Sequence, residues 1–387
     1  LRFAGIEIFQ PIIFQTCSKI PATLKEIRRI LQEYDQIDFS TEKAALASVV
    51  NVEESSYRRI GARMLVRSNG MWTGGISGGC LERDALKRSQ MAIFKNEATR
   101  VVYDTMDDDE NQIGVGLGCN GRIEVVFTPI SPEQENNELE QLRRIISSDQ
   151  PAIMLKVIDE EEGGSLLGQH LLLEDLSTIP SFAGVPAAEM EKYVAETLEK
   201  RKPRLFHYET ETGPIKLLVE FIRPETRLII IGDNYDVAAM LGIARELGWE
   251  TYLVGKRQKL TQEMYDLAHK VVEYEQADEL PVNEYTAVML MSHDYNKDKW
   301  MLPLFAAKQP RYMGMLGPKK RLHKMQGDLP EVDFDQLSFL YSPTGLEIGA
   351  ESPSEIALSI AAEIVATFRE KPGGFLREKE GTIHERD

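Results

Sequence analysis

The chain has 387 residues, of which 45 are Lys or Arg and 62 are Asp or Glu, so its formal net charge at neutral pH is −17. This length suits about two domains, each able to bury a core of its own. The acidic balance argues against a general polyanion binder, and therefore against nucleic acid as a partner. Three cysteines do not make a disulfide framework, which indicates a reducing compartment, with the cytoplasm as the default.

The first 39 residues are predicted to form an N-terminal segment that precedes the domains. Residues 3–14 are apolar, but Glu7 and Pro11 interrupt them, and the run is too short to cross a bilayer. We therefore expect neither a signal peptide nor a membrane anchor, and no membrane partner. The first residue is Leu rather than Met, so the true start stays open. Apolar residues at helical spacing predict an amphipathic helix at about residues 23–34.

Residues 40–223 are predicted to form a mixed α+β domain. The pair Asn69-Gly70 is a hairpin signal that joins a strand at residues 62–67 to a returning strand at residues 71–73. A glycine-rich loop follows, and a helix with one apolar side begins near Leu81. Later in the domain, the pattern predicts strands at residues 100–103, 123–127, 152–158, 166–172 and 215–222, and a helix at residues 187–200.

Two glycine-rich loops of this domain each contain one cysteine. Residues 74–82 read GGISGGCLE and residues 114–121 read GVGLGCNG. Glycine tolerates positive φ and lets a ligand approach the backbone. If the loops converge, Cys80 and Cys119 can bind a soft metal or a sulfur-rich ligand, whereas a zinc site lacks the second ligand pair.

The chemical state of these cysteines stays open at this point. Cys80 directly precedes a predicted helix, whose unpaired N–H groups and dipole favour a thiolate. Glu82 and Asp84 in the first turn satisfy the same dipole, so a small buried cysteine is an equal alternative. For Cys119 the buried, structural role is favoured, and Cys17 is assigned no role.

Charged residues near the loops have two interpretations each. Arg58, Arg59 and Arg63 lie close to the hairpin that leads into the first loop, where guanidinium groups can hold a phosphate. Ordinary surface ion pairs explain them equally well. The acidic run at residues 107–110 is interpreted as a surface loop rather than a metal site, because no histidine is nearby and the spacing lacks a ligand pattern.

Residues 224–371 are predicted to form a Rossmann-like domain, which begins at the turn around Pro224 and is followed by a mobile tail at residues 372–387. Strands and helices alternate, which indicates a parallel sheet with crossover helices. Ser352 and Glu355 form a capping box that opens a last helix. The predicted strands are residues 227–231, 250–254, 271–274, 287–291, 312–315 and 339–341, with helices at residues 236–247 and 298–307. The fold class is therefore α/β, with a mixed α+β domain first and a parallel-sheet domain second.

This second domain has only part of the dinucleotide fingerprint G-x-G-x-x-G. Gly232 follows the first strand, but Asn234 occupies the position of the second glycine, so the turn is expected to crowd a pyrophosphate. Gly314, Gly317 and Lys319 lie on a later strand-to-helix turn, where a helix N-terminus suits an anion. Only a degenerate nucleotide or anion site is inferred from these residues.

Longer motifs in the sequence resemble the XdhC/CoxI family. In the first half they are SSYRRIGARMLV at residues 55–66, ISGGCLE at residues 76–82 and LGCNG at residues 117–121. The second half is similar to the family's Rossmann-type domain through SHD at residues 292–294, YMGMLG at residues 312–317 and PTGLEIGA at residues 343–350. The resemblance extends from about residue 44 to about residue 366.

The resemblance implies an accessory protein that matures molybdenum hydroxylases such as xanthine dehydrogenase and carbon monoxide dehydrogenase. Such a chaperone binds the molybdenum cofactor, a molybdopterin, protects it while a cysteine desulfurase sulfurates it, and inserts it into the hydroxylase apoprotein. It is favoured as non-catalytic and cytoplasmic, and a homodimer is left open. Carried over by position, the cofactor-binding residues are Cys80, Cys119, Ser77, Gly78, Gly79, Gly118 and Gly121, with Arg58, Arg59 and Arg63 as phosphate ligands.

The sequence departs from the family at two positions where a Rossmann domain binds its nucleotide. Family members often have Gly-Ala-Gly-His after the first Rossmann strand and Asp at the end of the second, where this chain has Gly232-Asp233-Asn234-Tyr235 and Gly255. Both changes make NAD(P) a doubtful ligand. We therefore expect the second domain to bind another anion or to serve as a platform for docking and dimerisation.

Two other functions compete with the maturation factor. One is an NAD(P)-dependent oxidoreductase with His293 or Asp294 as its acid or base, because His293 follows a buried strand at the carboxyl edge of the sheet. The other is a redox switch that closes a disulfide between Cys80 and Cys119. The acidic charge and the incomplete fingerprint favour the maturation factor, which depends on the two thiols meeting at one pocket.

Overall fold

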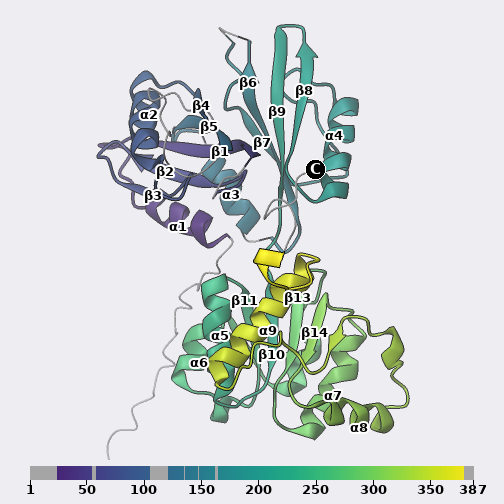
Figure 1. The fold of residues 1–387 in the computed structure, drawn as a ribbon. Coiled ribbons are helices and arrows are strands. Elements are labelled where there is room, and N and C mark those ends of the chain that lie inside the picture. Colours follow the sequence, from purple (N-terminus) through teal and green to yellow (C-terminus); the bar gives the residue numbers. More distant parts are fainter. Residues whose placement is uncertain are drawn as a thin grey trace, which may run out of the picture. The chain divides into compact units, whose positions relative to one another are not determined.

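The computed structural model describes residues 24–54, 58–104, 121–134, 136–146, 148–161 and 164–378. These residues form two compact units (Figure 1). The first unit contains residues 22–226 with two short later pieces, and the second contains residues 227–246 and 250–364. The predicted domain boundary at residues 224–226 adjoins this division.

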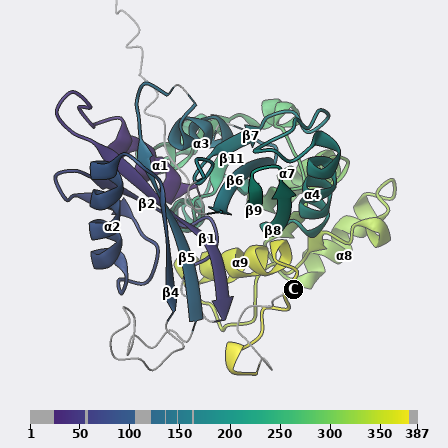
Figure 2. The ribbon, with the colours of Figure 1, turned by 90° about the horizontal axis from the view of Figure 1, so that it is seen from above.

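The first unit begins with an antiparallel five-stranded sheet in the order β3-β2-β1-β5-β4. Helix α2 lies on one face of this sheet (Figure 2) and buries Leu81, Ala85 and Ala92 against it. Helices α1 and α3 cover the other face. The elements are α1 (Lys25–Tyr34), β1 (Ala44–Glu54), β2 (Arg63–Arg67), β3 (Trp72–Gly74), α2 (Glu82–Lys95), β4 (Thr99–Asp104), β5 (Gly121–Ile130) and α3 (Glu138–Ile146).

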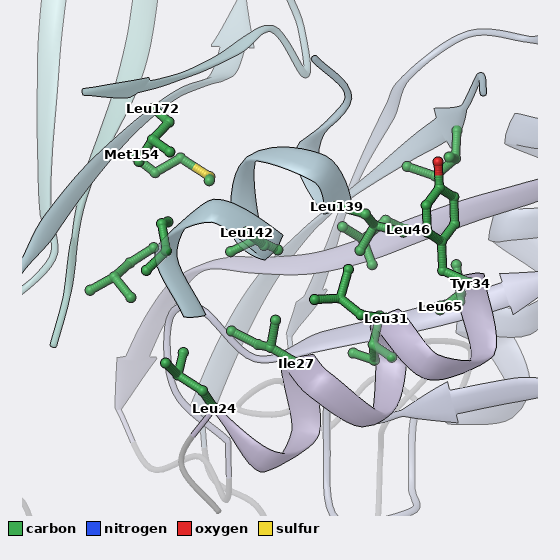
Figure 3. Close-up of a cluster of buried hydrophobic side chains, with 14 of the residues drawn as sticks. Leu24, Ile27, Leu31, Tyr34, Leu46, Leu65, Leu139, Leu142, Met154 and Leu172 are labelled. Carbon is green, nitrogen blue, oxygen red and sulfur yellow. The ribbon is translucent and has the colours of Figure 1, made fainter. Parts of the chain in front are cut away.

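A second antiparallel sheet of the same unit has the order β7-β6-β9-β8 and is covered by α4. Its elements are β6 (Ala152–Glu160), β7 (His170–Leu173), α4 (Ala187–Lys200), β8 (Arg204–Thr210) and β9 (Gly213–Ile222). Figure 3 shows how the two sheets share a core: Ile27 and Leu31 of α1 point toward Leu142 of α3, with Met154 and Leu172 of the second sheet beyond. This packing fixes α1 beside the β2–β3 hairpin.

The second unit is a six-stranded parallel sheet in the order β12-β11-β10-β13-β14-β15. This is the doubly wound Rossmann order, whose ligand crevice lies at the carboxyl ends of β10 and β13. The strands are β10 (Arg227–Ile231), β11 (Glu250–Val254), β12 (Lys270–Val272), β13 (Thr286–Leu290), β14 (Tyr312–Met315) and β15 (Leu340–Tyr341). The helices are α5 (Asp236–Leu247), α6 (Gln262–Leu267), α7 (Tyr295–Ala306), α8 (Lys319–Asp328) and α9 (Pro353–Phe368).

Local signals in the sequence predicted several of these elements correctly. At the β2–β3 turn, Gly70 has φ +89° and the Asn69 side chain accepts a hydrogen bond from the Met71 N–H. At the start of α9, the Ser352 hydroxyl accepts from the Glu355 N–H, and the Glu355 carboxylate accepts from the Ser352 N–H. The fold class and the predicted parallel sheet are confirmed.

Other predictions need correction. The strand predicted at residues 166–172 is only His170–Leu173, because the N–H groups of Leu166 and Leu167 turn back onto the Glu160 carboxylate and Gly168 has φ +82°. Helices α3 and α6 and strands β1 and β8 were not predicted. The predicted tail lies outside the described residues from residue 379 onward.

Candidate functional site

Strand β3 delivers the chain into the first glycine-rich loop, residues 74–82. Gly74 has φ +86°, and a Cβ there would overlap the backbone carbonyl of Arg63 and lie 2.9 Å from the Ile30 side chain. This glycine is therefore required by the close approach of β2 and α1, not by a ligand. Gly79 has φ +110°, and none of the described atoms lies within 4 Å of its Cβ position. The backbone at Gly79 is consequently open to a ligand.

Glu82 and Ser77 hold this loop in place. The Glu82 carboxylate accepts hydrogen bonds from the Ser77 hydroxyl (2.5 Å), the Ser77 N–H (2.8 Å) and the Ile76 N–H (3.2 Å). The Ser77 hydroxyl oxygen in turn accepts from the N–H groups of Gly79 and Leu81. Burial acts to raise the pKa of Glu82, but these hydrogen bonds outweigh it and leave the pKa below its ordinary value.

Cys80 is a free, exposed cysteine in this loop, and it directly precedes Leu81, the N-cap residue of α2. The alternative of a small buried cysteine is therefore wrong for Cys80. Asp84 in the first turn of α2 accepts from the Tyr103 hydroxyl at 2.9 Å and from Arg88 at 3.2 Å. Both acidic residues of the first turn thus have partners of their own, and the thiol remains accessible.

Most of the second cysteine loop lies outside the described residues. This holds for Gly118 and Cys119, and also for Cys17 and the acidic run at residues 107–110. Gly121 is buried at the start of β5. The meeting of Cys80 and Cys119 at one pocket, and the disulfide between them, therefore stay predictions.

A cavity of about 430 Å³ adjoins the Cys80 loop, between α1 and the β2–β3 hairpin. Arg58 is one of its lining residues and forms a two-pronged ion pair with the Glu26 carboxylate of α1. The cavity combines charged groups, an indole ring and bare glycine backbone. Its lining residues are Glu26, Arg29, Arg58, Trp72, Gly74, Gly75, Ser77, Gly79 and Glu82.

The three arginines predicted as phosphate ligands have different surroundings. Arg58 lines the cavity and Arg59 is exposed. Arg63 is only 3% exposed, and its guanidinium donates to Glu138 at 3.1 Å and to Glu220 at 2.7 Å. We therefore do not include Arg63 in the candidate site.

Arg63 instead belongs to a buried ionic network that joins the two sheets of the first unit. The Glu138 carboxylate on α3 accepts from Arg63 of β2 and, at 2.7 Å, from Lys156 of β6, and Lys156 also donates to the Ser48 hydroxyl of β1. Burial acts to raise the pKa of Glu138, but Lys156 and Arg63 outweigh it and hold the pKa well below its usual range. The network positions the strand that leads to the hairpin.

In the second unit, a close backbone approach and a hydrogen bond join the two turns that border the Rossmann crevice. A Cβ on Gly232 would lie 2.5 Å from the carbonyl oxygen of Met291, and the Asn234 side chain donates to the Ser292 carbonyl at 2.6 Å. These contacts bind the turn after β10 to the turn after β13. They hold the two sides of the crevice together where a pyrophosphate would lie.

The charged residues of this crevice are also paired with each other. Asp233 is buried and accepts from Lys297 at 3.0 Å and from Lys259 at 3.4 Å. Burial acts to raise its pKa, but Lys297 and the Lys256 N–H outweigh it and lower the pKa. His293, with φ +55°, pairs with Asp236 at the start of α5 at 2.7 Å.

The remaining predicted residues of this unit have local roles. Asp294 caps α7 by accepting from the N–H of Asn296 at 2.9 Å. A Cβ on Gly314 would lie 2.5 Å from the Met289 sulfur, so this glycine serves packing. Gly317 has φ +120° at the turn before α8, and Lys319 is the exposed first residue of that helix.

Two features of the described residues bear on the predicted classes of partner. Within the described ranges, no cluster of three or more His, Cys, Asp or Glu residues has the arrangement of a metal site. No helix in the described part of the chain has both the length and the apolar character to cross a bilayer.

The sequence reasoning missed three residues of the cavity: Glu26, Arg29 and Trp72. Glu26 and Arg29 are exposed and lie three residues apart on the polar face of α1. That spacing is a signal that they share one face of the helix. The packing of α1 against β3 depends on long-range contacts and could not be predicted from the sequence.

Fold and site together define a class: a two-unit α/β protein with an exposed cysteine in a glycine loop and a Rossmann sheet without the full dinucleotide fingerprint. Residues 40–104 match the model of the XdhC and CoxI family, and residues 228–364 match that of the XdhC Rossmann domain. The chain belongs to the XdhC/CoxI family, as the motifs indicated.

Known proteins similar to the chain extend over most of its length. A probable xanthine dehydrogenase subunit of Bacillus subtilis is 28% identical over 331 residues, which are 84% of this chain and 93% of that protein. The molybdenum cofactor insertion chaperone PaoD of Escherichia coli is 22% identical over 345 residues, 88% of each chain. A crystal structure described as a xanthine dehydrogenase from Bacillus halodurans is 26% identical, with a TM-score of 0.71 over 89% of this chain and 96% of that one.

Proposed function

We propose that this protein is a maturation factor that binds the molybdenum cofactor and delivers it to a molybdenum hydroxylase of the xanthine dehydrogenase type. Membership of the XdhC/CoxI family supports this role, as do the functions for which its relatives are named, one of which is molybdenum cofactor insertion. The observation that matters most is the exposed Cys80 in a fixed glycine loop beside a charged cavity.

The residues of this loop fit the chemistry of the cofactor, which is here the cargo. A cysteine sulfur is a soft ligand that suits a metal bound through sulfur. Cys80 supplies that group, and the open backbone at Gly79 lets a flat ligand come close. Arg58, which lines the cavity and is paired with Glu26, adds positive charge on the side where the phosphate would bind.

The rest of the proposal concerns partners. We include a cysteine desulfurase that sulfurates the bound cofactor, the hydroxylase apoprotein that receives it, a cytoplasmic location, and a homodimer that uses the second unit as a platform. Cys119, Gly118 and Gly121 are proposed to complete the cofactor site, with Ser77, Gly78 and Gly79 shaping the first loop.

The oxidoreductase alternative has less support from the side-chain contacts. His293 and Asp294, its candidate acid or base, are engaged by Asp236 and by the first turn of α7. Gly232 and Asn234 contact the opposite side of the crevice. A dinucleotide would have to break these contacts in order to bind.

Coexpression with a molybdenum hydroxylase tests the proposal. Cells that coexpress the wild-type protein should yield a larger amount of active, sulfurated hydroxylase than cells that coexpress Cys80→Ala. Cys17→Ala is the matched control and should behave as the wild-type protein does. We expect the Cys80 variant to lower the hydroxylase activity at least about tenfold, because the soft ligand is lost. Equal activity with both variants would remove Cys80 from the mechanism, and equal activity without the protein would refute the maturation role.

A further inference from the structure

The cavity beside the Cys80 loop has a wall that the proposed function does not use. Trp72 on β3 is 49% exposed and lines the cavity together with Glu26 and Arg29 of α1. Helix α1 precedes residues 40–104, the region that matches the family model. This wall is therefore built partly by a segment that the motifs did not single out.

Arg29 is the cation of this wall that is available to an anion. Within the described part of the chain it forms no ion pair, whereas Arg58 is held by the Glu26 carboxylate. Arg29 and Trp72 also line an adjoining cavity of about 430 Å³ along the same hairpin. The guanidinium and the indole ring thus lie at the junction of two hollows.

Three kinds of group meet here, and each recognises one part of a phosphorylated nitrogen heterocycle. An exposed indole ring stacks on a flat heteroaromatic ring. A carboxylate accepts hydrogen bonds from paired N–H groups on the ring edge, and an arginine holds a phosphate through two parallel hydrogen bonds. A volume of about 430 Å³ is within the range of small-molecule sites.

We propose that this cavity binds the pterin part of the cofactor, with Trp72 stacking on the ring and Arg29 holding the phosphate. Glu26 accepts from the amino edge of the ring through the lone pairs that its ion pair with Arg58 leaves unused. This inference rests on the proposed function, since it names the subsite for one end of the same cargo. Gly79, which lines the cavity, is the neighbour of Cys80 in the chain. A pterin in the cavity thereby places the metal end of the molecule toward the Cys80 thiol.

A peptide segment is the main competing occupant, because Trp72 and Met71 are both about half exposed on the hairpin. The charges favour the pterin. The lining includes Glu26, Arg29 and Arg58, and an apolar peptide would have to desolvate these groups without giving them partners.

A metal-free probe separates the pterin subsite from the thiol. Hydroxymethylpterin phosphate should bind the purified full chain in isothermal titration, and Trp72→Leu should weaken that binding about tenfold or more. Arg29→Gln and Glu26→Gln should each weaken it as well. Cys80→Ala should leave it unchanged, because the probe has no metal and no dithiolene.

Matched controls come from the second unit. Trp300 is 50% exposed and Arg245 is exposed on α5, so Trp300→Leu and Arg245→Gln should bind the probe as wild type does. Unchanged thermal unfolding of Trp72→Leu should show that the variant folds. Equal binding of the probe by the wild-type protein and by Trp72→Leu would overturn the inference. It would also be overturned if the wild-type protein bound an apolar peptide at the hairpin but did not bind the probe.

The same variants distinguish failure of this inference from failure of the proposed function. Wild-type protein should retain the cofactor released from a molybdenum hydroxylase, and Trp72→Leu should lose most of it. If wild type and Trp72→Leu retain the cofactor equally, the pterin subsite is wrong and the maturation role stands. If wild type retains none, the proposed function itself fails.

Discussion

The glycine loop of the first unit and the Rossmann turn of the second both contain glycine, which has no side chain, but the surroundings of the two glycines differ. The Cβ position of Gly79 has no described atom within 4 Å, whereas that of Gly232 lies 2.5 Å from a backbone oxygen. In the first case the space beside the backbone is open, and in the second the protein itself fills it. A glycine marks a close approach, but the structure decides whether a ligand or the chain makes it.

The charged groups of the two regions differ in the same way as the glycines. Glu82 and Ser77 shape the first loop from within and leave Cys80 exposed. In the second region, Asp233 and His293 pair with Lys297 and Asp236 across the crevice. The first unit is therefore the better candidate for binding the cargo.

The largest expected effect is a loss of stability in the first unit, and it comes from the buried ionic network rather than from the open loop. Glu138→Ala leaves Arg63 and Lys156 buried without their shared carboxylate, and breaking a buried ion pair in this way costs about 3–5 kcal/mol. In urea, the first unit of the variant should unfold at a lower denaturant concentration than in the wild-type protein, and the unfolding transition of the second unit should be unchanged.

Glu140→Ala is the control for that variant, because Glu140 is on the same helix but partly exposed in its ion pair with Arg143. It should cost less than about 1 kcal/mol. Equal losses for the two variants would contradict the buried network as a source of stability.

A second prediction tests whether the protein fills the Rossmann turn. Gly232→Ala should destabilise the second unit by about 1–3 kcal/mol, since its Cβ would collide with the Met291 carbonyl. Gly242→Ala on α5 has open space and should stabilise the helix by about 0.5–1 kcal/mol. Thermal unfolding measures both changes, and a neutral Gly232→Ala would show that the turn has room.

The same contrast predicts the behaviour of dinucleotides. Isothermal titration of the full chain with NAD and with NADP should show no micromolar binding, because Asn234 and Gly232 contact the loop after β13. Micromolar binding of either dinucleotide would overturn this and revive the oxidoreductase alternative.

The smallest expected effect concerns the loop itself. Glu82→Gln loses an ionised acceptor of the Ile76 and Ser77 N–H groups, so hydrogen exchange at these amides should become faster at neutral pH. Because the folded pKa of Glu82 is lowered, its stabilising effect is present above the ordinary value of 4.5 and is lost as the pH falls through the folded value. Wild-type exchange should therefore approach that of the variant in acid, and a difference that persists there would contradict the role of the carboxylate.

Local sequence signals predicted the fold well where they acted over a few residues. The Asn69-Gly70 turn, the Ser352 capping box and the apolar run of the strand that ends at Ile231 can each be recognised from their own residues. Helix α3 was missed because its buried face includes Glu138 and Gln141, which break the apolar pattern. The carboxylate of Glu138 is tolerated there only because Arg63 and Lys156 reach it from other strands.

The candidate site was predictable only in part for the same reason. The Cys80 loop and Arg58 are visible in the sequence, but Arg63 is indistinguishable from a surface arginine until Glu138 and Glu220 are known to surround it. The cavity wall needs α1 to pack beside β3, which depends on the shared core of the two sheets.

The most direct test of the central claim is the molybdenum and pterin content of the purified protein after incubation with cofactor released from a molybdenum hydroxylase. Wild type should retain molybdenum and pterin in equal amounts, near one per chain or per dimer, and Cys80→Ala should lose most of the molybdenum while Cys17→Ala retains it. Equal molybdenum in wild type and Cys80→Ala would contradict the account.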